Sequence, residues 1–296
     1  MSIYTHKDSN IRKTWLLFTV FLSSVIGIGY IFSQVYGNSG ILFFAVTFSV
    51  VTSIVSYWYS DRIVLSMYAA KPVTMDNAPE LYRIVENLAI TAGLPTPKIY
   101  LVPEKSPNAF ATGRDPQHAV IAVTEGLLQT MDKSELEGVL AHEMSHIGNR
   151  DMLLGTAAVI LVGFISILAD MFQRSMFFGR SNSNRDTPPV MLIIAVALSI
   201  LAPLAAMLLQ FAISRKRESL ADASGALLTR YPEGLASALE KLAKDTTPMR
   251  RANNTTAHLW IENPFENKKK TPFFAKLFMT HPPTEERIAA LRGMKI

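Results

Sequence analysis

Residues 141–146 read Ala141-His142-Glu143-Met144-Ser145-His146 and contain the pattern His-Glu-x-x-His. We predict that it lies on a helix that starts after Asp132, because Asp132 and Glu135 are spaced as a capping pair. The apolar side of this helix would be formed by Leu136, Val139, Leu140 and Ile147. Side chains four residues apart on a helix project from one face, about one turn apart. Both imidazoles can therefore reach one metal ion, with the Glu143 carboxylate beside them.

The composition restricts the chemistry that such a motif can perform. The 296 residues include no cysteine, which excludes a thiolate zinc site, a disulfide framework and a cysteine nucleophile. Histidine, aspartate and glutamate remain as strong ligands, and the pattern is typical of zinc. With this composition it would arise by chance on the order of 0.006 times. The alternative is that the two histidines are ordinary surface or core residues.

A third metal ligand is expected, because catalytic zinc sites usually have three protein ligands and one water. The extended motif with a glycine and a further histidine is absent, since Asn149 and Met152 occupy those positions. We predict Glu218 instead, because an antiparallel membrane hairpin would return it to the His-Glu-x-x-His helix. Asp222 shares a helix face with Glu218 and is predicted to accept a ring N–H from a ligand histidine. The alternative is a juxtamembrane charge cluster around Arg217.

The predicted chemistry is hydrolysis without a covalent intermediate. Zinc lowers the pKa of bound water from about 15.7 to about 7, and Glu143 can pass the released proton to the leaving amine. The tetrahedral oxyanion requires a further cationic or hydrogen-bonding residue across the cleft.

Four apolar runs are long enough, or nearly so, to cross a bilayer, which requires about 20 residues. They are residues 14–36, 41–60, 152–169 and 189–214, and they form two predicted hairpins. A cleaved signal peptide is the alternative for the first run, but this run exceeds the usual apolar region of about 7 to 15 residues. The second hairpin, residues 152–213, is predicted to interrupt the soluble part of the chain.

The distribution of basic residues predicts that both termini face the cytoplasm. One side of the spans would carry Lys7, Arg12, Lys13, Arg62, Lys71, Arg150, Arg215, Lys216 and Arg217. The other side would carry Arg174, Arg180 and Arg185. The net charge of +5 is spread in short clusters beside apolar runs, so the lipid bilayer, and not nucleic acid, is the predicted partner.

These boundaries predict a cytoplasmic leader over residues 1–13, a transmembrane hairpin over 14–60, and a metalloprotease domain over 61–151 and 214–296. This domain is predicted to be α+β and mainly helical. One helix would be capped by Asp76 or Asn77, begin at Pro79 and end at Gly93. Residues 98–102 and 119–123 are rich in β-branched side chains and are predicted strands.

Several motifs together resemble HtpX-type bacterial membrane proteases and, more distantly, the zinc-dependent CAAX prenyl proteases. They are residues 141–151, Arg217-Glu218 to Asp222, Asn108-Ala109-Phe110-Ala111, and Thr280-His281-Pro282-Pro283-Thr284-Glu285-Glu286-Arg287. The resemblance covers almost the whole chain. It implies a gluzincin-like fold in which His142, His146 and Glu218 hold one Zn²⁺ per subunit.

The resemblance also implies roles that the residues alone do not indicate. His281 and Arg287 would stabilise the oxyanion or position substrate, whereas without the family they would be a helix-entry residue and an exposed cation. Asn108, Ala109, Phe110 and Ala111 would border the cleft as an edge strand that an extended substrate can join, the alternative being a simple loop.

The function predicted is a multi-pass endopeptidase of the bacterial inner membrane, with its active site facing the cytoplasm. Its substrates would be unfolded or misfolded membrane polypeptides, and quality control under stress is inferred from the resemblance alone. One alternative is a non-cleaving membrane scaffold, against which the intact Glu143 argues. The other is a zinc hydrolase of small substrates, which a deep closed pocket would favour.

Overall fold

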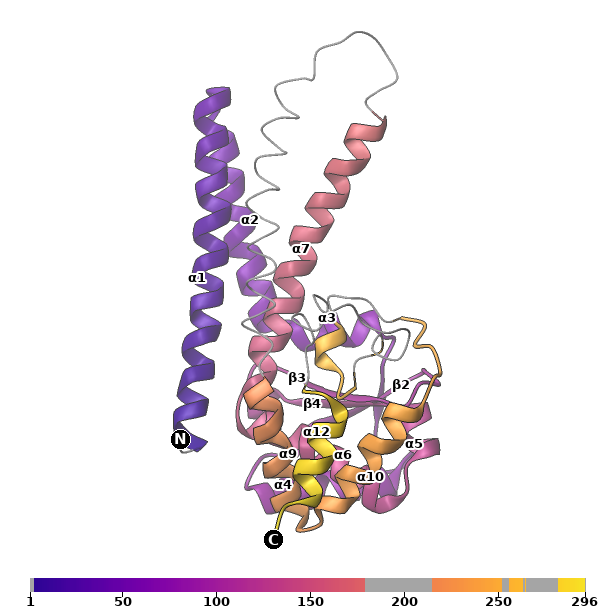
Figure 1. Cartoon of the computed structure of the whole chain (residues 1–296). Coiled ribbons are helices and arrows are strands. Elements are labelled where there is room, and N and C mark those ends of the chain that lie inside the picture. The colour runs from indigo at the N-terminus through magenta and orange to yellow at the C-terminus, as the bar shows by residue number, and fades with distance from the viewer. Residues whose placement is uncertain (1–2, 179–214, 252–255, 263, 265–281, 296) are drawn as a thin grey trace.

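Three long helices rise from a compact, mainly helical α+β body in the computed structural model (Figure 1). The structure describes residues 3–178, 215–251, 256–262, 264 and 282–295. The helices α1 (Ile3–Tyr36), α2 (Ser39–Trp58) and α7 (Asp151–Phe178) form what we call the stalk. The remaining described elements form the body, and the N-terminal end of α1 lies at the level of the body (Figure 1).

The stalk agrees with the predicted first hairpin and refines its limits. α1 begins at Ile3, so described residues of the predicted leader continue the first span as one helix. The turn lies where it was predicted, with Gly37 at a φ of 60° and the Asn38 side chain accepting a hydrogen bond from the Gly40 amide at the start of α2. A positive φ is unfavourable for residues with a Cβ, which is why glycine suits this turn.

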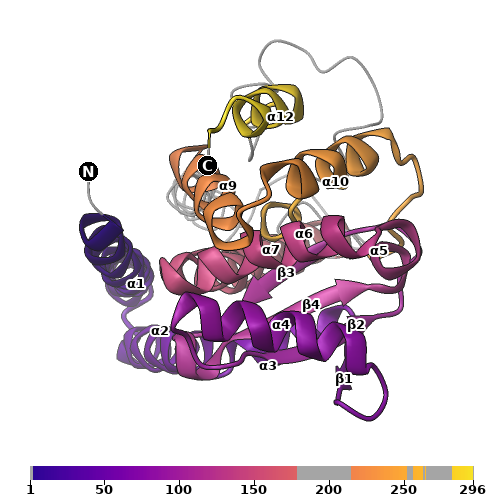
Figure 2. The same cartoon turned by 90° about the horizontal axis from the view of Figure 1, so that it is seen from below.

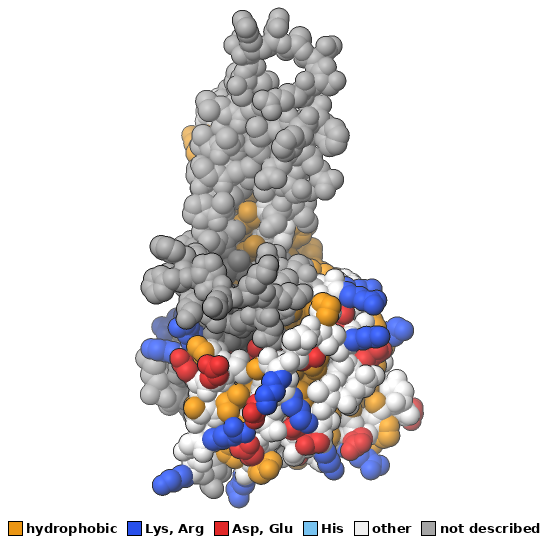
Figure 3. Space-filling model, turned by 45° about the vertical axis from the view of Figure 1, so that its right-hand side comes forward, with side chains coloured by type: hydrophobic (Ala, Val, Ile, Leu, Met, Phe, Trp, Pro, Cys, Tyr) orange, Lys and Arg blue, Asp and Glu red, His pale blue; other side chains and the backbone are white. Residues whose placement is uncertain are grey.

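Two described segments are long and apolar enough to cross a membrane, Asp8–Gln34 and Ser39–Trp58. A third is possible if α6 and the first part of α7, which meet at 83°, are counted as one bent span. Large apolar side chains on α1 and α2 are exposed, as expected for helices that face lipid, among them Trp15, Ile31, Phe43 and Phe44. On the face seen in Figure 3, the charged side chains that are coloured lie over the body. The predicted fourth span, residues 189–214, lies outside the described residues.

The stalk helices pack on one another just above the body. Leu17, Phe18 and Phe21 of α1 share a buried cluster with side chains of α7, namely Leu154, Ala157, Ala158, Leu161, Val162 and Ile165. This contact fixes the N-terminal part of α1 beside the start of α7.

A four-stranded sheet has the order β1-β2-β4-β3. β2 (Lys98–Val102) and β4 (Val120–Thr124) pair in parallel, as strands where the sequence predicts them to within one residue. β1 (Lys71–Val73) and β3 (Ala109–Thr112) add antiparallel at the two edges. β1 was not predicted, because three residues that include a proline carry too little strand signal.

Helices cover both faces of the sheet (Figure 2). The face with Ile99, Ile121 and Val123 packs in one core with α4 (Pro79–Ala92), α6 (Lys133–Gly148) and α10 (Pro232–Lys244). The opposite face, with Phe110 and Ala122, packs against α3 (Ser60–Met67) and Trp260. The alternation along each strand is that of a sheet buried on both sides. The other elements are η1 (Pro116–His118), α5 (Glu125–Thr130), α9 (Arg215–Thr229), η3 (Ala257–Leu259) and α12 (Thr284–Arg292).

The helix ends test the predicted caps. The capping box of Asp132 and Glu135 at the start of α6 is confirmed, and Gly93 ends α4 in the left-handed conformation at a φ of 65°. The predicted cap of α4 was wrong, because Ala78 occupies that position. Asn77 instead accepts a hydrogen bond from the Thr74 amide within the preceding turn, and Pro79 holds the residue before it out of the helical conformation.

Candidate metal centre

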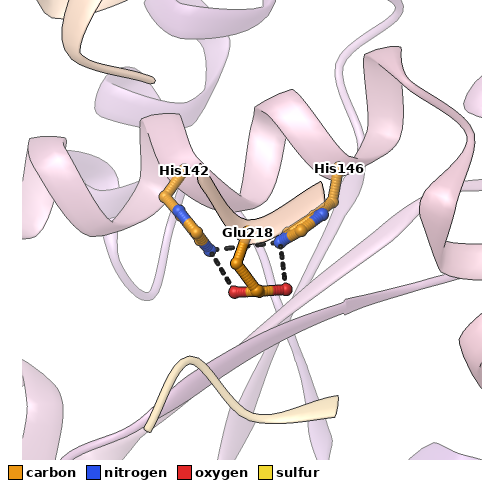
Figure 4. A group of neighbouring side chains, drawn as sticks. All are labelled: His142, His146 and Glu218. Carbon is orange, nitrogen blue, oxygen red and sulfur yellow. Dashed lines mark hydrogen bonds and ion pairs between the residues drawn. The ribbon is translucent and has the colours of Figure 1, made fainter. Parts of the chain in front are cut away.

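The three predicted ligands lie together at the junction of body and stalk. His142 and His146 project from α6, and Glu218 projects toward them from the first turn of α9 (Figure 4). The two Nε2 atoms are 3.1 Å apart, and the Glu218 carboxylate oxygens lie 3.7 Å from His142 Nε2 and 3.6 Å from His146 Nε2. Ligands about 2.0–2.1 Å from a tetrahedral zinc ion would be about 3.3 Å from one another. The donor set and its spacing therefore fit a metal ion of this kind.

Close packing of α9 on α6 places Glu218 there. Gly225 follows Glu218 by about two helical turns and so lies on the same face of α9. A Cβ at Gly225 would be 2.9 Å from the His142 amide nitrogen, which leaves no room for a larger residue at this crossing. Gly138 of α6 meets the Gly234–Leu235 backbone of α10 in the same way. α6 is thus held between the sheet and two helices that contact its backbone.

A carboxylate lies against the other ring nitrogen of each histidine. Asp222 Oδ1 is 2.9 Å from His142 Nδ1, and Asp151 Oδ2 is 3.1 Å from His146 Nδ1. Each carboxylate favours the tautomer with a proton on Nδ1, which leaves Nε2 free to bind a metal. Sequence reasoning missed Asp151, although an aspartate at the first position of the next helix, five residues after His146, was a visible signal.

The carboxylates also set the basicity of His146. Burial alone would lower its pKa, but the negative charges of Glu218, Asp151 and Glu143 outweigh burial and raise the pKa to about 9. A histidine must be neutral to bind a metal, so a metal ion has to displace a proton from His146 near neutral pH.

Arg287 of α12 binds Asp222, the carboxylate that lies against His142. Its guanidinium donates to both Asp222 oxygens at 2.8 and 2.7 Å and to the Ile261 carbonyl oxygen at 3.0 Å. Burial alone would raise the pKa of Asp222, but the paired Arg287 outweighs burial and holds that pKa well below its usual range. The alternative of an exposed cation was wrong, because Arg287 is 3% exposed. Its predicted contact with substrate stays a prediction, and His281 lies outside the described residues.

Glu143 is buried beside the ligand histidines at 2% exposure. Burial raises its pKa, while the two histidines and a hydrogen bond from the Ala111 amide oppose the rise. A carboxylate with a raised pKa beside a metal-ligand set has the properties of a general base.

The edge strand β3 passes next to Glu143, and residues 257–262 lie along its outer edge. The Ile261 amide donates to the Ala109 carbonyl at 3.0 Å, and the Asn108 side chain donates to the Glu262 carbonyl at 2.8 Å. The Phe110 side chain lies on the face of the sheet away from α6, where it packs on Trp260. The pocket between the ligands and residues 258–261 has a volume of about 50 Å³, room for a few water molecules. The position of β3 at a sheet edge agrees with the prediction, and substrate binding by residues 108–111 stays a prediction.

Arg217 was the centre of the alternative explanation for Glu218. Arg217 is 5% exposed, and its Nε lies 4.0 Å from Asp151 Oδ1. Arg217 therefore faces Asp151, while the next residue, Glu218, faces the Nε2 atoms of His142 and His146.

Residues 76–295 match the model of peptidase family M48. This chain belongs to peptidase family M48. A protease HtpX homolog from Thermococcus kodakarensis is 49% identical over 282 residues, which are 95% of this chain and 94% of the relative. A protease HtpX homolog from Caldanaerobacter subterraneus subsp. tengcongensis is 45% identical over 302 residues, covering 100% of this chain and 99% of the relative.

The family and the apolar stalk make this chain a membrane metallopeptidase. Its fold is also similar to the crystal structure of S. mikatae Ste24p, with a TM-score of 0.54 at 22% identity. The match covers 94% of this M48 peptidase and 66% of the Ste24p chain. The predicted HtpX-type family is thus confirmed, and the likeness to Ste24p is one of fold.

Proposed function

We propose that this M48 peptidase is a zinc endopeptidase that holds one Zn²⁺ per subunit through His142, His146 and Glu218. The observation that carries the proposal is the meeting of two Nε2 atoms and one carboxylate within 3.7 Å beside the buried Glu143. Zinc fits this set of nitrogen and carboxylate oxygen donors, and the absence of cysteine leaves no thiolate to compete.

When bound, zinc supplies Lewis acidity, which lowers the pKa of water to about 7 and polarises the scissile carbonyl. Glu143 takes the proton from the attacking water and then delivers it to the leaving amine. The raised pKa makes this carboxylate a stronger base for the first step, and its carboxylic acid then protonates the more basic leaving amine. The Ala111 amide holds the carboxylate in place, and Asp222 and Asp151 keep both ligand rings in the tautomer that presents Nε2.

Substrate would bind along β3. The Ala109 and Ala111 backbone groups face the outer edge, where Ile261 and Glu143 contact them, so an extended peptide laid along this edge would pass beside Glu143. Residues 258–261 line the small pocket beside the ligands, and we propose that they move aside when a polypeptide enters. Arg287 and His281 are proposed to support the oxyanion or the substrate from the side of α12.

The site would face the cytoplasm from the inner membrane of a bacterial cell. The N-terminal end of α1 and the body lie at the same end of the stalk (Figure 1), and nine of the twelve basic residues near the predicted spans belong to that side. We propose that the metalloprotease domain comprises residues 61–151 and 214–296, with the second hairpin inserted over 152–213. A site at the membrane surface suits misfolded membrane proteins as substrates, and quality control under stress is proposed from the family resemblance.

The test compares the purified full-length wild type with Glu143→Gln, Glu218→Ala and the control Glu137→Gln. Glu137 lies on the same helix, outside the metal centre. Cleavage of casein and of an unfolded membrane protein is measured together with the zinc content of each sample. We expect Glu143→Gln to retain zinc and lose cleavage by at least about a hundredfold, Glu218→Ala to lose zinc, and Glu137→Gln to match the wild type. Normal proteolysis by Glu143→Gln would refute the mechanism.

A further inference from the structure

A buried asparagine of the first stalk helix contacts the support of the metal centre. Asn10 is 3% exposed, although it lies near the N-terminal end of an apolar membrane segment. Its Nδ2 donates to the Asn149 carbonyl at 3.1 Å and to Asp151 Oδ1 at 2.5 Å. Both partners are acceptors, so the amide nitrogen, and not the amide oxygen, must face them.

Asp151 uses its two oxygens in two directions. Oδ1 accepts from Asn10 of α1, and Oδ2 lies 3.1 Å from His146 Nδ1. Arg217 Nε is farther from the same Oδ1, at 4.0 Å, so the hydrogen bond from Asn10 is the closer contact that sets the rotation of the carboxylate facing the His146 ring. The same amide bonds Asn149, the C-cap of α6, so it also ties the α6–α7 junction to α1.

Burying the amide of Asn10 in α1 costs free energy, and membrane anchoring alone does not explain why an amide is present at this position. An unpaired amide buried in an apolar segment is unfavourable, and an apolar side chain would serve lipid contact or helix packing better. Leu17, Phe18 and Phe21 already provide apolar packing of α1 against α7 about two to three turns further on. What Asn10 adds is a directed contact with Asp151.

We infer that Asn10 is a positioning residue of the metal centre, so that the first membrane helix completes the site through the chain Asn10–Asp151–His146. This inference rests on the proposed metal centre and extends it into the stalk. Anchor and active site are then coupled, because a shift of α1 relative to α7 withdraws the donor that orients the Asp151 carboxylate.

The test measures the dissociation constant of zinc for full-length protein in detergent, by competition with a chromophoric chelator. The variants are Asn10→Leu, which keeps the volume and removes the donors, Asp151→Ala, and the double variant. Asn10→Asp is a second probe that keeps the shape and turns a carboxylate toward Asp151. Thr14→Val is the control, because Thr14 is a buried residue of the same helix whose hydroxyl donates only to the Asn10 carbonyl among the contacts described.

We expect Asp151→Ala to weaken zinc binding about 10- to 100-fold, and Asn10→Leu and Asn10→Asp to weaken it about three- to tenfold. The double variant should bind no more weakly than Asp151→Ala, since Asn10 acts through Asp151. The visible spectrum of the Co²⁺-loaded protein should change in Asn10→Leu and remain that of the wild type in Thr14→Val. A merely structural role of Asn10 would alter stability without altering this spectrum.

Three results would overturn the inference while leaving the proposed function intact. They are wild-type zinc affinity in both Asn10 variants, a loss in the double variant equal to the product of the single losses, and an unchanged Co²⁺ spectrum. Failure of the wild type itself to bind zinc would instead refute the proposed metal centre.

Discussion

The two ligand histidines are equivalent in the motif but are supported by different parts of the molecule. His142 is backed by Asp222, which is held by the Arg287 guanidinium, and all three belong to the body. His146 is backed by Asp151, which accepts a neutral amide donor from α1 of the stalk. The support of His142 is a bidentate ion pair within the body, whereas Asp151 combines a hydrogen bond from a membrane helix with a single longer contact, 4.0 Å from its Oδ1 to Arg217 Nε.

The body and the stalk thus orient the two ligand histidines through different interactions. A buried ion pair is rigid but becomes costly when either partner is removed, because the remaining charge is left without compensation. A neutral hydrogen bond is weaker, and it depends on how α1 docks on α7. We therefore expect changes on the His142 side to act on stability first, and changes on the His146 side to act on metal binding first.

The largest effect is expected from Arg287→Met. The change leaves the Asp222 carboxylate buried at 5% exposure without its cation, and breaking such a pair costs about 3–5 kcal/mol of unfolding free energy. Denaturant unfolding of the metal-free protein in detergent measures this loss.

Arg292→Met is the matched control for Arg287→Met. Arg292 lies on the same helix α12 and pairs with Glu233 and Glu240, but its side chain is 45% exposed. Water competes for such surface pairs, so the unfolding midpoint should remain close to that of the wild type. Equal losses in both variants would contradict the distinction between the buried ion pair and the surface pair.

The next effect concerns the His146 side and depends on pH. Because carboxylates raise the pKa of His146 to about 9, this ring is protonated below pH 9 in the metal-free protein, and zinc must displace the proton. Apparent zinc affinity should therefore rise about tenfold per pH unit between pH 6 and 8 and level off above pH 9. Calorimetric titrations in buffers of different ionisation enthalpy measure the proton released.

Asp151→Ala sharpens this second prediction. The variant lacks one of the carboxylates that raise the pKa of His146, so the affinity should level off at a lower pH than in the wild type. A pH dependence that is flat from pH 6 to 8 in the wild type would show that His146 is already neutral, and would refute the electrostatic account of its environment.

The sequence predicts the parts of the site that follow from helical spacing. His142, Glu143 and His146 lie on one helix with a recognisable cap, and Asp222 is one turn from Glu218, so local geometry relates them. The return of Glu218 to α6 followed from treating the apolar runs as a hairpin. Apolar length likewise predicted the first two spans, and β-branched runs predicted β2 and β4.

The parts that the sequence did not predict depend on contacts between distant segments. Asn10 lies in a polar stretch with no periodic pattern, and only the docking of α1 beside α7 brings it to Asp151. Ile261 and Glu262 meet β3 through their backbone groups, which bond the Ala109 carbonyl and the Asn108 side chain and place few demands on the side chains of residues 261 and 262. Local sequence propensity predicts neither the contact of Asn10 with Asp151 nor that of Ile261 with β3, because tertiary packing decides both.

The smallest effect is expected from Gly225→Ala, which tests how closely α9 packs on α6 at the metal centre. A methyl group added by Gly225→Ala would meet the His142 amide nitrogen at 2.9 Å, so α9 must move away from α6 and carry Glu218 with it. Overpacking of this kind costs about 1–3 kcal/mol, and zinc affinity should fall with it. Gly148→Ala, at the end of α6, is the matched control, because its new methyl group would lie 3.5 Å from the Leu94 side chain in ordinary contact. Gly148→Ala should leave zinc affinity unchanged and slightly raise stability, since alanine restricts the unfolded chain. If Gly225→Ala bound zinc as tightly as Gly148→Ala, the position of Glu218 would not depend on the close crossing of α9 and α6, and the body would hold its ligand by some contact other than this one.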